Sequence, residues 1–199
     1  MELAYRGITL IVPDSVYPPS EDSFMLSAGA GRLRGEILEV GCGSGIASLS
    51  CAKAHRSNRV LGVDINPDAV RCARSNAGSN GIRNASFAVS DLFSRVPAKR
   101  FDAIMFNPPY LPTADEERLS GPINHAYDGG SDGRQVLDRF LALFDRYMRP
   151  GGSLLLIQSS LNDRKRTLAG LRSLGYRTRT LSTEKFFFER LYLLKAVKP

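Results

Sequence analysis

Short apolar segments alternate with helical segments along most of this chain, and no other feature restricts its fold as strongly. The segments expected as buried strands are 36–40, 60–64, 85–89, 101–106 and 153–157. The clearest helical pattern has apolar residues at 3.6-residue spacing from Val136 to Met148 and is expected to stop at Pro150. Such alternation produces a mostly parallel sheet with helices on both faces. The sequence therefore predicts an α/β fold.

The two ends of the chain add elements outside this alternation. These are a small hairpin within 3–12, a helix capped by Ser20, a basic helix at about 162–174, and a final hairpin of strands near 177–181 and 188–197. We expect one domain, 1–199. Within it, 1–30 form an N-terminal extension and first helix, and 31–199 form the core.

Composition restricts the class of protein further. The chain has 199 residues, 43% of them hydrophobic, and no apolar run approaches the roughly 18 residues of a membrane span. We therefore expect no membrane partner and a cytoplasmic location. Three cysteines cannot all pair, and with only two histidines no metal site is expected.

The net charge is +7. This charge favours an acidic partner such as nucleic acid, but the basic residues are dispersed and not interleaved with aromatic residues, so direct nucleic-acid binding is not required. His55 and His125 are not expected to be catalytic.

A glycine-rich turn follows the first expected core strand. Its glycines, Gly41, Gly43 and Gly45, let the backbone turn tightly and approach a ligand closely. The spacing differs from a dinucleotide fingerprint, and Glu39 precedes the turn. A carboxylate there suits a cationic ligand better than a pyrophosphate. S-adenosyl-L-methionine carries a sulfonium and an ammonium, so this pattern favours it over NAD.

The next two strands each end near an acid. Asp64 lies about twenty residues beyond the glycines, where an acid accepts hydrogen bonds from ribose hydroxyls. Asp91 is placed to accept a hydrogen bond from an adenine amine, with Leu92 beside the ring. Because carboxyl ends of parallel strands share one edge, these acids predict one cofactor site there.

The fourth expected strand is followed by Asn107-Pro108-Pro109-Tyr110. Two prolines fix the backbone, so the Asn side chain and the Pro108 carbonyl are held rigidly. In our hypothesis the side-chain oxygen of Asn107 and the carbonyl of Pro108 each accept a hydrogen bond from one N–H of a target nitrogen. Tyr110 is expected to pack against the planar target group. The same residues form the predicted substrate site. The polar loop 111–131 is expected to be functional because long loops usually are.

Five motifs resemble the eukaryotic and archaeal, HemK-like, release-factor glutamine methyltransferases. They are Val16–Phe24, the glycine turn, Asp64–Pro67, Asn107–Tyr110 and Ala126–Arg134. The resemblance implies a class I methyltransferase Rossmann-like fold, with a seven-stranded sheet and a C-terminal antiparallel hairpin. Two departures are Pro18, where the family often has Glu, and Ser23, where it usually has Thr.

The resemblance also implies further contacts and partners. Tyr17, Glu21, Ser23 and Ile65 are implied as cofactor residues, and S-adenosyl-L-homocysteine as the product. The implied substrate is the glutamine of the Gly-Gly-Gln motif in a class I peptide release factor. The implied partner is a small zinc-binding activator that forms a heterodimer at the sheet edge near Ala85–Val89.

Other functions stay open at this point. An adenine-N6 methyltransferase acting on DNA or RNA uses a similar tetrapeptide, but it has to flip a base and normally carries a recognition domain. A protein lysine methyltransferase is a third hypothesis. A non-catalytic scaffold that only binds the cofactor is the alternative outside the enzymes.

Overall fold

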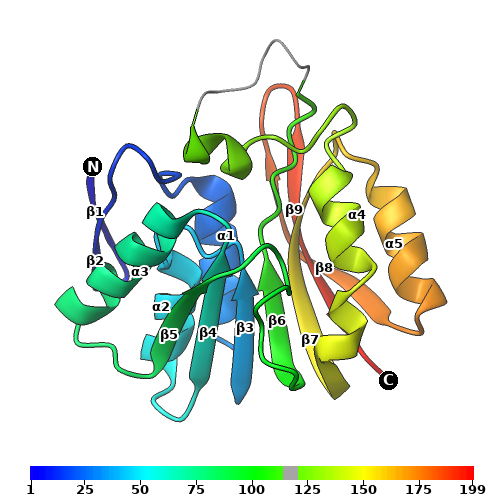
Figure 1. The fold of residues 1–199 in the computed structure, drawn as a ribbon. Helices are drawn as coiled ribbons and strands as arrows, with labels where there is room; N and C mark the ends of the chain where they lie inside the picture. Colours follow the sequence, from blue (N-terminus) through cyan, green and yellow to red (C-terminus); the bar gives the residue numbers. More distant parts are fainter. Residues whose placement is uncertain (114–120) are drawn as a thin grey trace.

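The computed structural model describes residues 1–113 and 121–199, and a mixed sheet forms its centre (Figure 1). The strands of this sheet are β3 (Glu36–Val40), β4 (Arg59–Asp64), β5 (Ala85–Val89), β6 (Phe101–Phe106), β7 (Met148–Ser159), β8 (Arg177–Lys185) and β9 (Arg190–Val197). In the described residues this sheet has 7 strands, ordered β5-β4-β3-β6-β7-β9-β8. Strands β3 to β7 are parallel, whereas β9 is antiparallel to both β7 and β8. The predicted sheet with its C-terminal antiparallel hairpin is confirmed.

Helices cover both faces of this sheet, as predicted. The helices are α1 (Glu21–Ala30), α2 (Ile46–Ala54), α3 (Pro67–Ser79), α4 (Gln135–Leu141) and α5 (Arg164–Ser173), with 3₁₀ helices η2 (Pro122–Ala126) and η3 (Phe144–Tyr147). Successive strand residues point to opposite faces. Ile104 therefore packs in one core with α4, η3 and α5, while its neighbours Ala103 and Met105 pack in another with α1 and α2.

The helix predicted over Val136–Met148 is wrong in its second half. Helix α4 ends at Leu141, η3 follows, and Met148 begins β7. Phe144 and Met148 are nonetheless fully buried in the core that α4 joins. The apolar spacing predicted correctly which side chains are buried. A 3₁₀ helix and a strand, however, can bury these side chains as well as a continued helix can. Pro150 lies inside β7, in a part where its pairing with β6 shifts register.

The predicted N-terminal hairpin forms a small sheet of its own. Its strands β1 (Glu2–Tyr5) and β2 (Ile8–Ile11) pair antiparallel. Helix α3 holds β2, because the backbone N–H of Ile11 donates to Asn76 Oδ1 at 2.9 Å. The segment that leaves β2 is tied down by Asn66 Nδ2, which donates to the Ser15 carbonyl at 2.9 Å. The hairpin therefore places residues 15–20 beside the strand tips.

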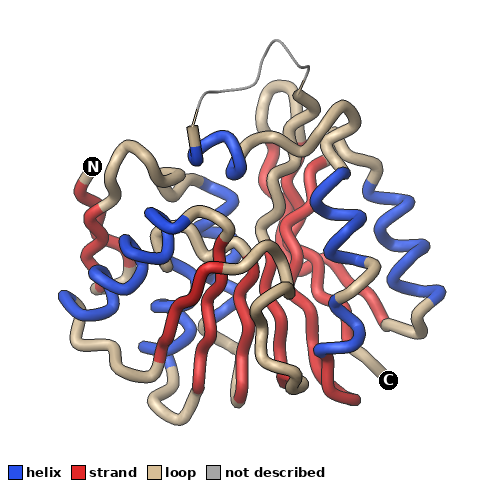
Figure 2. The backbone as a smooth tube through the Cα atoms, viewed as in Figure 1, coloured by secondary structure: helices blue, strands red, loops and turns tan. Residues whose placement is uncertain are grey.

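The loops after the parallel strands gather at one edge of the sheet. Figure 2 shows η2 and the turn between β8 and β9 above the upper ends of the strands. Residues 114–120 of the predicted functional loop lie outside the described residues. Within the described ranges, no helix is long and apolar enough to cross a membrane.

Candidate active site

A cavity of about 320 Å³ opens at the carboxyl edge of the sheet, a size within the range of small-molecule sites. The predicted residues that line it are Tyr17, Ser23, Glu39, Gly41, Gly43, Asp64, Ile65, Asp91, Leu92, Asn107, Pro108 and Pro109. Glu21, Gly45 and Tyr110 are not among its lining residues, and Glu21 is exposed. The structure therefore brings most of the predicted site together around one cavity.

The glycine-rich turn adopts the backbone conformation that its composition predicts. The φ angles are +68° at Gly41, +50° at Gly43 and +87° at Gly45, all in the left-handed region that favours glycine. A Cβ at Gly45 would also lie 3.0 Å from the Cβ of Ala73 in α3. The turn therefore needs glycine both for its conformation and for its packing.

Glu39 lies at the base of this turn and is almost completely buried. Its Oε2 accepts a hydrogen bond from the Ser48 backbone N–H at 2.8 Å and another from the Ser48 hydroxyl. Burial raises the pKa of Glu39 to about 8, although the two bonds from Ser48 lower it. A cation brought into the cavity would favour the ionised carboxylate.

Asp64, at the end of β4, joins two of the cavity loops. Its Oδ2 accepts from the Gly43 backbone N–H at 2.8 Å, and its Oδ1 accepts from the Asn66 backbone N–H at 2.9 Å. Burial raises the pKa of Asp64, and these backbone hydrogen bonds oppose the rise. Each carboxylate oxygen keeps further acceptor capacity for a ligand.

Asp91 also lines the cavity but has a partner that the sequence did not predict. Its Oδ2 accepts a hydrogen bond from Arg139 of α4 at 2.7 Å, and both side chains are about half exposed. Arg139 lines the cavity too. Nothing in the sequence links it to Asp91, because the two residues meet only through the tertiary fold.

Asn107 directly follows β6 and carries the most informative atom of the site. Its side-chain Oδ1 is buried, yet it has no hydrogen-bond partner within the described part of the chain. Buried acceptors without partners are rare, because leaving one unpaired costs about 1–3 kcal/mol. Asn107 and Pro108 both line the cavity, so the structure holds a buried, unpaired acceptor on a residue of the cavity wall.

Asp22 is a cavity residue to which the sequence analysis gave no role of its own beyond its place in the motif Val16–Phe24. It is 2% exposed. Its carboxylate accepts hydrogen bonds from Ser20 Oγ at 2.9 Å, Ser23 Oγ at 3.0 Å and Tyr17 OH at 3.3 Å. Ser20 thus bonds Asp22 rather than capping α1 with its side chain.

The Asp22 carboxylate also reaches the tetrapeptide. Tyr110 OH donates to Asp22 Oδ2 at 3.4 Å. Burial, followed by the charge of Asp22, raises the pKa values of Tyr17 and Tyr110, so both phenols stay protonated as donors. This cluster ties the segment before α1 to the loop after β6. The signal for it was an acid surrounded by hydroxyl residues at 17–23.

A glycine-rich turn after β3, acids after β4 and β5, and Asn-Pro-Pro-Tyr after β6, on this sheet order, define a class I methyltransferase. The chain belongs to the methyltransferase small domain family, whose model matches residues 22–187. The prediction of an S-adenosyl-L-methionine-dependent methyltransferase is thus confirmed at the level of the family.

Similar proteins support this assignment over almost the whole chain. A putative protein N5-glutamine methyltransferase from Methanocaldococcus jannaschii is 42% identical over 98% of both chains. Human methyltransferase HEMK2 is 33% identical, over 92% of this chain and 90% of its own. A chain of the solved E. cuniculi Mtq2-Trm112 complex, which is responsible for the methylation of the translation termination factor eRF1, superposes with a TM-score of 0.71. It is 28% identical, and the match covers 93% of this chain and 99% of that one.

Proposed function

We propose that this protein transfers a methyl group from S-adenosyl-L-methionine to the side-chain amide nitrogen of a glutamine. The proposed target is the Gly-Gly-Gln motif of a class I peptide release factor, which implies a cytoplasmic location. The free, buried Oδ1 of Asn107 at the cavity carries this proposal. The relatives named as glutamine methyltransferases support the choice of target.

The lining residues fit the cofactor by their chemistry. The buried carboxyl of Glu39 suits the methionine ammonium, and Asp64 suits the ribose hydroxyls. Asp91 would accept a hydrogen bond from the adenine amine, with Leu92 and Ile65 against the ring. This bond would add to the one that Asp91 accepts from Arg139, or would replace it. Tyr17 and Ser23 lie on the cavity wall from the segment around α1, and Gly41 and Gly43 supply backbone. When bound, the cofactor supplies an electrophilic methyl group and leaves as S-adenosyl-L-homocysteine.

In the proposed mechanism the tetrapeptide positions the nucleophile. An amide nitrogen is a weak nucleophile because its lone pair is delocalised. Asn107 Oδ1 accepts one N–H of the target amide and the Pro108 carbonyl accepts the other, which fixes the nitrogen and stabilises the positive charge that grows on it. Such alignment can supply on the order of 7 kcal/mol of the barrier. Pro109 keeps this backbone rigid, and Tyr110 is held by Asp22 beside it.

We also propose a heterodimer with a small zinc-binding activator at the β5 edge; the solved Mtq2-Trm112 complex supports the pairing with a second chain. Among the described strands, β5 pairs with β4 alone. The backbone carbonyl of Asn84 and the backbone N–H of Ser90 bond to β4. Because backbone groups alternate in direction along a strand, the N–H and C=O groups of residues 85, 87 and 89 point away from β4, toward the open edge. Arg74 Nε donates to the outward carbonyl of Phe87 at 3.1 Å. A strand added at this edge would have to displace Arg74 from that carbonyl.

The test is mass spectrometry of the release factor after incubation with this protein, the activator and S-adenosyl-L-methionine. We expect one added methyl group on the glutamine of the Gly-Gly-Gln motif, and none with the Asn107→Ala variant. Parallel reactions with duplex and single-stranded oligonucleotides and with a lysine-containing histone test the rival methyltransferase functions. Methylation of one of those substrates in place of the release factor would overturn the proposal. Cofactor binding in calorimetry with no transfer to any substrate would instead support a scaffold.

A further inference from the structure

We propose that the turn between β8 and β9 is a docking element that holds the folded protein substrate while its glutamine enters the cavity. This aromatic tip consists of Phe186, Phe187 and Phe188. The inference rests on the proposed function and names the surface through which the same site would hold its substrate.

The aromatic tip is exposed to a degree that folding alone does not explain. Phe187 is 93% exposed and Phe188 is 85% exposed, with Phe186 at 40%. The rings of Phe187 and Phe188 contact each other edge-to-face, with centroids 4.6 Å apart. Turns usually carry small polar residues, and contiguous exposed aromatic groups mark interaction surfaces. The tip therefore presents a preformed apolar contact.

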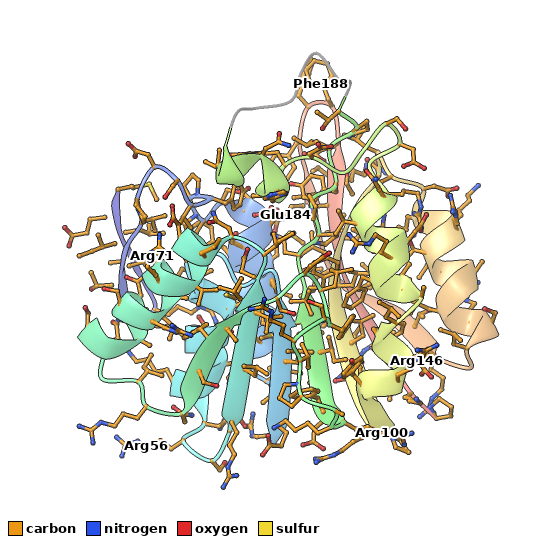
Figure 3. All side chains as sticks on the ribbon, viewed as in Figure 1. Arg56, Arg71, Arg100, Arg146, Glu184 and Phe188 are labelled. Atoms are coloured by element: carbon orange, nitrogen blue, oxygen red, sulfur yellow. The ribbon has the colours of Figure 1, made fainter. Side chains whose placement is uncertain are left out.

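Most of the large hydrophobic residues that are exposed in the described part of the chain lie at the same edge as the cavity. Leu111 follows the tetrapeptide after β6, Leu161 follows β7, and the tip follows β8, which runs parallel to β7. Ile65, after β4, is exposed on the cavity wall. The remaining exposed large hydrophobic residues of the described ranges are Met1 and Ile11, at the N-terminal hairpin, and Leu174, directly after α5. Figure 3 shows Phe188 at the top of the view, at this edge of the sheet.

Hydrogen bonds fasten the base of the tip to the catalytic side of the sheet. Ser159 Oγ, at the end of β7, donates to Glu189 Oε2 at 2.8 Å. The Ser160 backbone N–H donates to the Arg190 carbonyl at 2.9 Å, and the Arg190 N–H donates to Ser160 Oγ at 3.0 Å. After burial and the charge of Asp22, the charge of Glu189 is the next cause of the raised pKa of Tyr110. The tip and the cavity therefore share one edge of the sheet, and this edge is the rim on which a substrate would rest.

The charges around the tip favour a protein over a nucleic acid. The negative charges of Glu184 and Glu189 equal in number the positive charges of Lys185 and Arg190. A nucleic-acid surface needs an excess of positive charge. Arginines labelled in Figure 3, such as Arg56 and Arg100, lie at the opposite edge of the sheet. The β5 edge, proposed for the activator, is at the other end of the strand order. A folded domain whose loop enters the cavity would rest on this rim.

The test replaces Phe187→Ser and Phe188→Ser together in the full chain with its activator. We expect the Kd for intact release factor, measured by fluorescence anisotropy, to rise about tenfold or more, as for aromatic interface residues. The KM for intact release factor should rise in parallel. The kcat/KM for a short peptide containing Gly-Gly-Gln, and the Kd for S-adenosyl-L-methionine, should stay within about twofold. The matched control, Ile11→Ser with Leu174→Ser, removes exposed apolar side chains away from this rim and should leave all four values unchanged.

An unchanged Kd for intact release factor in the Phe variant would overturn the inference, as would an equal loss toward the short peptide. Unchanged release-factor binding together with lost self-association in light scattering would assign the tip to a second copy of this chain. Unchanged release-factor binding together with lost binding to phosphatidylcholine vesicles would assign the tip to a membrane surface. Unchanged release-factor binding together with lost binding to single-stranded RNA would assign it to RNA, and either outcome would overturn the inference. If the wild-type protein methylates no release factor, the proposed function fails. If it does and the variant binds normally, only the docking inference fails.

Discussion

Replacing Asn107 with alanine separates the chemistry of the site from its stability. The Oδ1 atom has no partner in the described part of the free protein, so its removal breaks no native hydrogen bond at that atom. We expect the melting temperature to hold or rise, since a buried unpaired acceptor costs about 1–3 kcal/mol. In the transition state the same atom would accept from an amide that gains positive charge. Loss of one such bond costs roughly 2.7–4 kcal/mol, or about 100- to 1,000-fold in kcat.

The assay is single-turnover methylation of release factor at saturating cofactor, with calorimetry of cofactor binding and a thermal melt of the same preparation. Asn84→Ala is the matched control. Asn84 Nδ2 donates to three backbone carbonyls, of Ala52, His55 and Asn58, and Asn84 does not line the cavity. That variant should melt lower and keep its kcat. A loss below about tenfold for Asn107→Ala, or a parallel loss of cofactor binding, would refute the assigned role.

Three further predictions follow from particular contacts. The pKa of Glu39 is raised from 4.5 to about 8, so the unfolded chain releases a proton that the folded chain keeps as pH rises between these values. The melting temperature of the ligand-free protein should therefore fall across this window, and Glu39→Gln should flatten the profile; a profile as steep as the wild type's would contradict this. A Cβ at Gly133 would lie 2.4 Å from the Tyr110 carbonyl, at a φ of +67°, whereas one at Gly78, inside α3, meets nothing within 4 Å. Gly133→Ala should destabilise the protein by more than about 1 kcal/mol and Gly78→Ala should stabilise it by up to about 1 kcal/mol; equal shifts in chemical denaturation would refute the comparison. Arg74→Ala should tighten activator binding about fivefold, since it removes a competing donor worth about 1 kcal/mol; unchanged affinity in titration calorimetry would place the activator elsewhere.

The polar and charged groups that organise the site were only partly predictable. Glu39, Asp64, Asp91 and Asn107 each follow or end a recognisable apolar strand, and parallel strands bring such positions to one edge. Arg139 and Asp22 carried no comparable signal. Arg139 reaches Asp91 from α4, and Asp22 takes on its importance only when Tyr17 and Tyr110 converge on it.

The helix ending at Leu141 shows the same limit. Apolar spacing measures which side chains are buried, and Phe144 and Met148 are buried as predicted. It does not measure which backbone conformation delivers them, because η3 and the start of β7 reach the same core.

The sequence by itself determined the succession of strands and helices along the chain, the glycine turn and the acids at the strand tips. Continuous apolar runs, and glycines that can adopt the left-handed backbone conformation, are local properties of the chain. The tertiary structure alone decided which residues line the cavity and which partners they have. It paired Asp91 with Arg139, left Asn107 Oδ1 without a partner in the described residues, and kept Glu21 and Tyr110 out of the cavity lining. These outcomes depend on contacts between segments far apart in the chain. The spacing of residues within one segment does not predict such contacts.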